Sequence, residues 1–410
     1  MTNSVVIPKA SPAVRSAVPG VAVRTAFAGG RPKVFFVFGT RPEVIKLAPV
    51  FSELRRTGRG MEVIAVCSGQ HTDLLTPLLS LFDFQPDFHL DVMQARQTPN
   101  DVCARVLERL APIVAEHAPD LMIVQGDTTT ALAGALTAFH HRIPVAHVEA
   151  GLRSGNPASP FPEEMNRRMI TQLATFHFAA TGRNRESLLQ EGIAAESIFV
   201  TGNPVVDALH HIQNSPASAK VQELIKRGGG RKLIVLTTHR RENFGETMRG
   251  NLRALRRFIE IHEDVALVFP VHPNPNVVEV AKAELSGEPR ILLVDPLNYS
   301  DFIHLLSHAW LVTSDSGGIQ EEAPSLGKPL LVLRSNTERQ EAIDSGAAVL
   351  VGDAPERLAA LLEQAYDHPG WADSIKCVRN PFGDGTAATQ IAEVLTQALC
   401  GAQRKEEIRR

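Results

Sequence analysis

The sequence predicts an α/β protein with two Rossmann-like domains, each a parallel β-sheet covered by helices. Short β-branched runs alternate with longer Ala- and Leu-rich amphipathic stretches along the chain, a pattern typical of repeated βαβ units. At 410 residues the chain is longer than a single hydrophobic core usually grows, which favours two domains. Aromatic residues make up only 5% of the chain, which fits an aliphatic α/β core better than an all-β one.

The β-branched runs are the expected strands, six in each half of the chain. Each is followed by a stretch long enough for a crossover helix, so the strands of each half are expected to be parallel. The strands of the first half are expected at 34–38, 63–67, 121–124, 145–148, 176–180 and 198–200, and those of the second half at 233–237, 266–269, 291–294, 311–313, 330–333 and 348–351.

Breaks rich in proline and glycine divide the chain into its expected parts. The Gly-Asn-Pro segment at 202–204 ends the first half, and Asn-Pro-Phe-Gly at 380–383 marks a second crossing between domains. A last helix, 387–399, would then pack on the first domain. The expected parts are a disordered extension (1–30), a first Rossmann-like domain (31–204), a second one (205–381), a returning helix (382–402) and a solvated tail (403–410).

Charge and cysteine usage exclude several classes of function. The formal net charge is −3 and the pI is about 6.6, so no basic excess predicts a nucleic-acid partner. No run reaches the roughly 18 apolar residues of a membrane span, so no membrane insertion is expected. The four cysteines are far apart and form no Cys-x-x-Cys pair. We expect free thiols in a reducing, cytoplasmic compartment and no metal site.

Three carboxylates lie where an α/β protein places catalytic groups. Asp127 follows the expected strand 121–124, and Glu149 closes the next strand, 145–148. Glu163 follows in a turn flanked by prolines. Ligands bind beyond the carboxyl ends of parallel strands, so side chains from adjacent strand ends can reach one substrate. The pattern predicts paired acid/base chemistry.

A glycine pair after the expected strand 311–313 is typical of an anion site. Ser316, Gly317 and Gly318 open a turn at the start of a helix, where free backbone N–H groups favour a phosphate. Glu322, further along that helix, could accept hydrogen bonds from sugar hydroxyls. The alternative is an ordinary strand-to-helix turn. The P-loop lysine pattern is absent, which argues against an ATPase.

Basic residues follow the first strand of each half. Arg41 and Lys46 lie near the start of a helix and could neutralise a diphosphate, or could be surface residues. His239 follows the strand 233–237 and could be a phosphate ligand or a general acid, or a turn histidine bound to backbone. The dinucleotide fingerprint Gly-x-Gly-x-x-Gly is absent after the first strand, which argues against NAD.

Two further residues could face a ligand in the second half. Phe302 follows the strand 291–294 and could stack on a base, although an aromatic residue at the start of a helix is often part of the core. Arg339 follows the strand 330–333 and could face a cleft between the domains.

Six ordered motifs carry a resemblance to a known family. They are Phe-Gly-Thr-Arg-Pro-Glu (38–43), Gln-Gly-Asp-Thr-Thr-Thr (125–130), His-Val-Glu-Ala-Gly-Leu-Arg (147–153), Pro-Glu-Glu-Met-Asn-Arg (162–167), Thr-His-Arg-Arg-Glu-Asn (238–243) and Asp-Ser-Gly-Gly-Ile-Gln-Glu-Glu (315–322). Together they resemble the non-hydrolysing UDP-N-acetylglucosamine 2-epimerases over nearly everything from Lys33 to Leu399.

The resemblance implies a GT-B architecture, with the active site in an interdomain cleft, and a homodimer. It implies reversible conversion of UDP-N-acetylglucosamine (UDP-GlcNAc) to UDP-N-acetylmannosamine (UDP-ManNAc), which would feed the synthesis of cell-surface polysaccharide precursors. UDP leaves by anti elimination, a 2-acetamidoglucal forms, and UDP adds back with C2 protonated on the opposite face. No NAD or other cofactor is expected because the reaction is redox-neutral, and no metal because cationic side chains can carry the diphosphate charge.

Position by position, the resemblance implies a role for each candidate. The catalytic residues would be Asp127, Glu149, Glu163, His239, Arg41 and Lys46, and the UDP-binding residues would be Phe302, Ser316, Gly317, Gly318, Glu322 and Arg339. Bacterial relatives often carry Gln-His-x-x-Gln, which helps to bind a second, activating UDP-GlcNAc. Here an effector site would comprise Gln70, Arg96 and His272, but Asp73 replaces the second glutamine and puts such activation in doubt.

Three other functions are compatible with the same features. A GT-B glycosyltransferase would share the nucleotide half, and a hydrolysing epimerase would release free sugar and UDP. A catalytically inactive nucleotide-sugar sensor would bind without turnover. The paired acids at Asp127 and Glu149 favour the epimerase.

Overall fold

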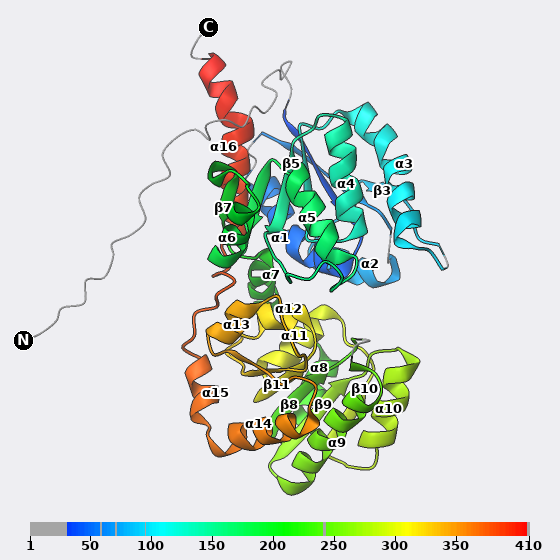
Figure 1. Ribbon diagram of the computed structural model, residues 1–410, viewed down its shortest axis with the longest axis vertical. Helices are drawn as coiled ribbons and strands as arrows, with labels where there is room; N and C mark the ends of the chain where they lie inside the picture. The colour runs from blue at the N-terminus through cyan, green and yellow to red at the C-terminus, as the bar shows by residue number, and fades with distance from the viewer. Residues whose placement is uncertain (1–30, 58–59, 70–71, 95, 241–242, 408–410) are drawn as a thin grey trace, which may run out of the picture.

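The structure, a computed structural model, describes residues 31–57, 60–69, 72–94, 96–240 and 243–407. The extension expected at 1–30 lies outside these residues. Two lobes stand one above the other, and the last helix returns along the upper lobe (Figure 1). The expected α/β architecture with two parallel sheets is confirmed.

The amino-terminal lobe is built on a seven-stranded sheet with the order β3-β2-β1-β4-β5-β6-β7, in which all neighbours are parallel. Hydrophobic side chains fill both faces, as a doubly covered parallel sheet requires. Its strands are β1 (Lys33–Phe38), β2 (Glu62–Cys67), β3 (Phe88–His89), β4 (Leu121–Gln125), β5 (Val145–Ala150), β6 (Phe176–Ala179) and β7 (Ile198–Val200), and its helices are α1 (Arg41–Arg56), α2 (Thr72–Leu81), α3 (Pro99–His117), α4 (Thr129–His140), α5 (Glu163–Leu173) and α6 (Gly182–Gln190).

The carboxy-terminal lobe repeats the plan with six parallel strands in the order β10-β9-β8-β11-β12-β13. Its strands are β8 (Lys232–Thr237), β9 (Val265–Pro270), β10 (Ile291–Val294), β11 (Leu311–Ser314), β12 (Leu330–Val332) and β13 (Ala348–Leu350). Its helices are α8 (Ala219–Arg227), α9 (Glu246–Ile261), α10 (Pro275–Leu285), α11 (Tyr299–Ser307), α12 (Gly317–Glu322), α13 (Gln340–Asp344), α14 (Pro355–Asp367) and α15 (Gly370–Ile375).

Each sheet has one point where the strand order reverses, and these points position the site. In the first sheet β1 pairs with β4, and in the second β8 pairs with β11. In open α/β sheets, ligands bind beyond the carboxyl ends of the strands at such a point. The turns that follow β1, β4, β8 and β11 therefore carry the residues closest to a bound ligand.

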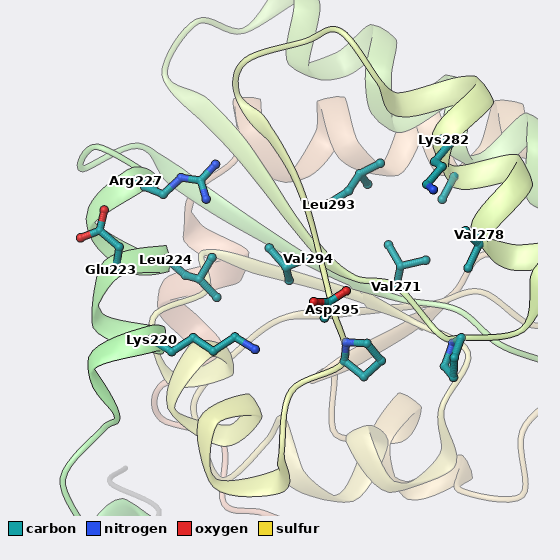
Figure 2. Close-up of a pocket in the computed structure, with 13 residues that line it drawn as sticks. Lys220, Glu223, Leu224, Arg227, Val271, Val278, Lys282, Leu293, Val294 and Asp295 are labelled. Atoms are coloured by element: carbon teal, nitrogen blue, oxygen red, sulfur yellow. The ribbon is translucent and has the colours of Figure 1, made fainter.

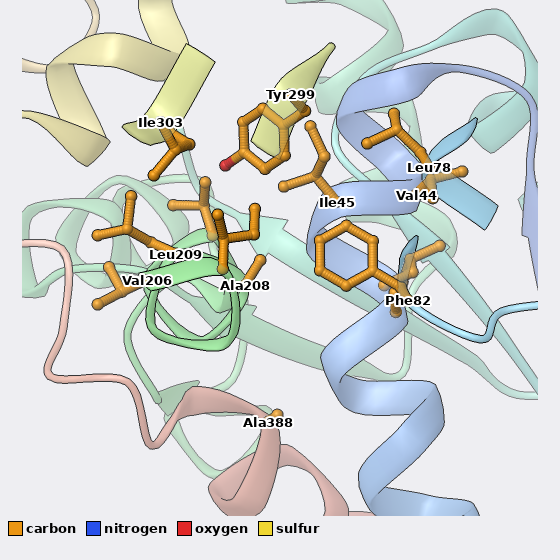
Figure 3. Close-up of a cluster of buried hydrophobic side chains, with 14 of the residues drawn as sticks. Val44, Ile45, Leu78, Phe82, Val206, Ala208, Leu209, Tyr299, Ile303 and Ala388 are labelled. Atoms are coloured by element: carbon orange, nitrogen blue, oxygen red, sulfur yellow. The ribbon is translucent and has the colours of Figure 1, made fainter. Parts of the chain in front are cut away.

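Two helices join the lobes. α7 (Pro204–Gln213) packs against α1 of one lobe and against α11 and α12 of the other, while α16 (Ala387–Glu407) packs against α1 and α7. The backbone N–H of Ala388 donates to Asp207 Oδ1 at 2.9 Å. One hydrophobic cluster continues through this junction and includes Ile45 of α1, Leu209 of α7 and Tyr299 of α11 (Figure 3).

All twelve expected strands are present, with ends that move by at most two residues. The two-residue strand β3 was not expected, since so short a run carries no alternating pattern. The last helix continues to Glu407, so the tail expected to begin at 403 starts inside a helix. The domain boundary expected after 204 falls at the start of α7, which contacts both lobes.

Other expectations concern thiols, metals and membranes. All four cysteines are free, as expected. In the described part of the chain, no group of three or more His, Cys, Asp or Glu side chains is arranged to hold a metal ion. Within the same residues, no helix combines the length and apolar character that crossing a bilayer demands.

Candidate active site between the lobes

Glu149 is presented by an irregularity at the end of β5. Its backbone has φ of +67°, a left-handed conformation that non-glycine residues seldom adopt. The pairing of β5 with β6 shifts register between Val148 and Ala150, so Glu149 is the extra residue of a bulge. Such bulges re-aim a side chain, and backbone outliers of this kind concentrate at functional sites.

The Glu149 carboxylate is buried and surrounded by donors. It forms an ion pair with Lys46, and it accepts hydrogen bonds from Gln125 Nε2 at 3.1 Å and from Asn203 Nδ2 at 2.7 Å. Burial by itself would raise its pKa, but Lys46 and then Arg339 outweigh that effect and lower the pKa to about 2. Glu149 is thus held as a carboxylate at neutral pH.

The same lysine joins Glu149 to the other lobe. Lys46 Nζ lies 3.3 Å from Glu321 Oε2 of α12, and Asn203 Nδ2 donates to that same oxygen at 3.2 Å. Glu321 Oε1 in turn accepts from Arg339 Nε at 2.6 Å. All these groups are buried, so the network is a continuous chain of desolvated charges across the junction. Lys46 therefore does not lie free to meet a diphosphate; its contacts are with carboxylates.

Asp127, in the turn after β4, is held by α5. Arg167 approaches Asp127 Oδ2 with both Nε, at 3.1 Å, and Nη2. Asn166 Nδ2 donates to the backbone carbonyl of Asp127 at 2.9 Å. About 22% of the Asp127 side chain stays exposed, against 7% for Glu149. Asp127 is thus an anion that a ligand can still reach.

Glu163 begins α5 on the same face that binds Asp127. Positions 163, 166 and 167 are spaced i, i+3 and i+4, which places their side chains together on a helix. Glu163 is half-buried, and its side chain makes no hydrogen bond or ion pair with any other described residue. Of the three expected catalytic acids it alone has no cationic partner in the described part of the chain.

The elements that carry the three acids pack together. A Cβ atom added to Gly126, which precedes Asp127, would lie 3.6 Å from Glu149 Oε1. The turn after β4 therefore packs directly beside Glu149, while α5 packs on that turn from the other side. The expectation that adjacent strand ends bring these carboxylates together agrees with this geometry.

His239 is held at the end of β8 by a buried aspartate. Asp315 Oδ2 accepts from Thr238 Oγ1, from the backbone N–H groups of His239 and Arg240, and from Asn243 Nδ2, at 2.8 to 3.0 Å. Asp315 Oδ1 lies 3.1 Å from His239 Nδ1. Burial opposes the charge of Asp315, but His239 and the backbone donors lower its pKa to about 2. This arrangement leaves the Nε2 edge of His239 on the far side of the ring from Asp315.

The glycine turn after β11 opens α12 as expected. Gly317 leaves no room for a side chain, because an added Cβ would lie 2.7 Å from Arg339 Nη1. Arg339 is itself buried and paired with Glu321 and with Glu338, at 2.6 and 2.5 Å. It therefore packs behind the turn as a support, in place of the ligand-facing position that the sequence suggested.

Glu322 and Arg41 come from different lobes, and their charges interact. Tyr299 Oη donates to Glu322 Oε1 at 2.7 Å, and burial raises the pKa of Glu322 to about 7. Arg41 is half-buried; desolvation lowers its pKa, although Tyr299 and Glu322 oppose that change.

Phe302 is half-buried and packs on the hydrophobic cluster of the junction, which leaves one side of its ring open.

The expected effector residues are only partly placed. Gln70 lies outside the described residues. Arg96 is exposed in a turn with φ of +57°. His272 stacks on His239 with ring centroids 5.6 Å apart, and burial followed by the neighbouring His239 lowers its pKa. His272 thus packs directly against His239.

Sequence reasoning missed the residues that hold the acids and the histidine. Arg167, Asp315 and Glu321 stand inside motifs already singled out, yet their partners come from other strands and could not be assigned. Asn203 had a local signal, since it opens the Asn-Pro start of a helix, but its second partner is 118 residues away.

A groove of about 710 Å³ lies away from these residues, between α8 and α10 at the edge strand β10 (Figure 2). Its floor is apolar and Lys220, Arg227 and Lys282 stand at its rim. None of the expected site residues lines it.

Comparison with known proteins shows the family to which the chain belongs. Residues 52–396 match the family model described as UDP-N-acetylglucosamine 2-epimerase. The chain is 44% identical over 363 residues to the UDP-N-acetylglucosamine 2-epimerase of Bacillus subtilis, covering 88% of this chain and 94% of that protein. It is 43% identical over 369 residues to the enzyme of that name from Escherichia coli K12, covering 88% and 98%.

Solved structures extend the comparison to the fold. UDP-GlcNAc 2-epimerase from Neisseria meningitidis, bound to UDP-GlcNAc, is 38% identical, with a TM-score of 0.83 over 88% of this chain and 99% of that chain. The Methanocaldococcus jannaschii enzyme, in complex with UDP-GlcNAc and UDP, is 32% identical, with a TM-score of 0.76 over 89% and 99%. The likeness in sequence and structure covers both lobes, and the chain belongs to the UDP-N-acetylglucosamine 2-epimerase family.

Proposed function

We propose that the protein interconverts UDP-GlcNAc and UDP-ManNAc by elimination and re-addition of UDP. The observation that carries this proposal is the convergence of three acids of one lobe opposite the glycine turn of the other. Family membership supports the substrate, since the similar proteins from Neisseria meningitidis and Methanocaldococcus jannaschii are described with UDP-GlcNAc bound.

The carboxy-terminal lobe would hold the nucleotide. Its diphosphate would meet the backbone N–H groups of Ser316, Gly317 and Gly318, with Arg41 and His239 supplying positive charge from either lobe. Glu322, fixed by Tyr299, would accept the ribose hydroxyls, and Phe302 would cover the uracil. Arg339 would support the site indirectly, by packing against Gly317 and holding the glycine turn in place.

The amino-terminal lobe would move the proton. A base takes the proton from C2 of the sugar, the C1–O bond breaks, and UDP departs with the bonding electrons, leaving 2-acetamidoglucal. UDP then adds back to C1 while an acid delivers a proton to the other face of C2. Two groups are needed, because one carboxyl cannot reach both faces of a planar double bond.

The contacts favour Glu163 and Asp127 as the two proton carriers. Glu163 forms no ion pair with any other described residue, and Asp127 is the more exposed of the two paired acids. Glu149 is deeply paired, which makes it a poor proton donor and a weak base. The role of Glu149 would be to hold Lys46 and Asn203 in place and to contribute a fixed negative charge to the site.

Turnover in D₂O tests the elimination. Both UDP-GlcNAc and UDP-ManNAc recovered at equilibrium are expected to carry deuterium at C2, because the abstracted proton exchanges with solvent before it returns. Proton NMR of the C2 position measures the label. Epimerisation that leaves C2 unlabelled would exclude proton exchange with solvent and count against the mechanism.

The same reaction mixture separates the rivals. A glycosyltransferase without an acceptor would form no UDP-ManNAc, and a hydrolysing epimerase would release free N-acetylmannosamine with UDP. A sensor would leave the substrate unchanged. The free thiols support a cytoplasmic location, and we propose that the product supplies cell-surface polysaccharide synthesis.

We also propose that the protein is a homodimer. Helices α4 and α5 pack side by side and carry the exposed apolar side chains Phe139, Met165 and Met169. Exposed apolar patches commonly mark contact surfaces. Sedimentation equilibrium is expected to give twice the 44.6 kDa chain mass, and Met165→Glu with Met169→Glu to give the single mass. A wild-type protein at the single chain mass would refute the dimer.

A further inference from the structure

Glu43 is a fully buried carboxyl group that bonds to two turns of the amino-terminal lobe. Its Oε2 accepts from the backbone N–H groups of Gly39 and Thr40, at 3.0 and 2.7 Å. Its Oε1 accepts from Thr128 Oγ1 at 2.7 Å. The first two bonds belong to the turn after β1, and the third belongs to the turn after β4, so one side chain joins both.

These are the turns that carry two of the proposed site residues. Thr40 directly precedes Arg41, and Thr128 directly follows Asp127. Thr128 is also fixed from its own side, because its Oγ1 caps α4 by accepting from the backbone N–H of Ala131 at 2.9 Å. A shift of Glu43 would therefore be transmitted to both Arg41 and Asp127.

A capping role alone does not account for Glu43. Glu43 accepts from the backbone N–H of Thr40, as the acid of a capping box at the start of α1 does. Here the carboxyl has no exposure, and none of the described cationic side chains forms an ion pair with it. Burial raises its pKa to about 7 although three donors oppose that change. A buried carboxyl without a cationic partner is costly even when it is hydrogen-bonded, so capping α1 is a small return for this burial.

We propose that Glu43 is a positioning residue that fixes the separation of the Arg41 turn from the Asp127 turn. On the proposed function, Arg41 faces the departing diphosphate and Asp127 the sugar ring. Elimination and re-addition need both groups aligned on one intermediate. The link set by Glu43 would keep that alignment while the intermediate and UDP remain bound, so that UDP returns to C1 before it escapes.

Removal of the link is tested by Glu43→Ala. We expect kcat to fall about 10- to 100-fold, because a displacement near 1 Å at a catalytic group has an effect of that size. We also expect free UDP and 2-acetamidoglucal to appear during turnover, measured by a coupled UDP assay and by NMR. Glu43→Gln should restore kcat to within about threefold, since its amide oxygen can accept the two N–H groups and its NH₂ can donate to Thr128.

The chain contains a matched control. Thr98 and Asp101 form a second capping box, at the exposed start of α3, where Asp101 accepts from Thr98 N at 2.8 Å and touches no site residue. Asp101→Ala should lower the melting temperature by a few degrees without changing kcat or releasing UDP. Glu43→Ala and Thr128→Ala should be non-additive in kcat, because each breaks the same link.

The outcomes separate this inference from the proposed function. A wild-type protein that epimerises, together with a Glu43→Ala variant that keeps kcat within threefold and releases no UDP, would overturn the positioning role only. Full additivity of the two alanine variants would overturn it as well. Failure of the wild type to epimerise would instead remove the proposed function on which the inference rests.

Discussion

Lys46→Met is expected to abolish measurable epimerisation and to lower the free energy of unfolding by about 3–5 kcal/mol, the usual cost of breaking a buried ion pair from one side. Methionine keeps the length of the side chain but leaves Glu149 and Glu321 buried without their shared cation. Steady-state kinetics and urea unfolding at pH 7 measure the two effects.

Two further variants show that the effect comes from the pair. Lys46→Met combined with Glu149→Gln should recover part of the unfolding free energy, since one uncompensated charge is gone, without recovering activity. Lys226→Met, on the exposed face of α8, should change the unfolding free energy by no more than about 0.5 kcal/mol. A Lys46→Met protein as stable as wild type would show that Glu149 and Glu321 do not depend on Lys46.

The pH dependence of this pair follows from the sign of the shift. The pKa of Glu149 is lowered from its ordinary value to about 2 in the folded protein, so its contribution to stability is present above pH 4.5 and is lost as the pH falls toward 2. Wild type should therefore lose unfolding free energy over that range more steeply than Lys46→Met, in which Glu149 has no lysine partner.

Glu163→Gln is expected to lower kcat by about 10²- to 10⁴-fold, the contribution usual for a positioned proton carrier, while the melting temperature stays within about 2 °C of wild type. The fold should tolerate the change because the Glu163 side chain makes no hydrogen bond or ion pair with other described residues. Kinetics in both directions and thermal unfolding are the measurements.

The comparison with other acids makes this prediction specific. Glu108→Gln, on the exposed face of α3, should leave kcat unchanged. Glu149→Gln should lower both activity and stability, because its amide would turn an N–H₂ group toward Lys46 or Asn203. If Glu163→Gln retained a kcat within threefold of wild type, Glu163 would not carry the proton and the roles assigned to the three acids would have to be revised.

The strands were predictable because they follow from short runs of β-branched residues, which are a local feature of the sequence. Runs such as 198–200 and 291–294 have the bounds expected from their β-branched residues. β3 was missed because two residues carry no period. The full length of α16 was missed because the sequence of its last turns is polar and carries no apolar periodicity.

The positions of the candidate acids at strand and helix ends were also predictable, because strand ends follow from the βαβ pattern. Their partners were not. Lys46 and Glu149 are 103 residues apart, and Glu43 and Thr128 are 85 apart. The sequence suggested that Lys46 meets a diphosphate and that Arg339 faces the cleft, whereas both are buried against carboxylates. No local signal shows which of several cations a buried carboxylate will take.

The sequence by itself determined the alternation of strands and helices, the parallel sheets and the positions of Asp127, Glu149 and Glu163 at strand and helix ends, because each follows from interactions between near neighbours in the chain. Only the tertiary structure decided that Arg167 pairs with Asp127 and Lys46 with Glu149, while the Glu163 side chain forms no ion pair with any other described residue. The physical reason is that charge state depends on burial and on cations brought from distant elements, and these become known only when the two lobes are packed together.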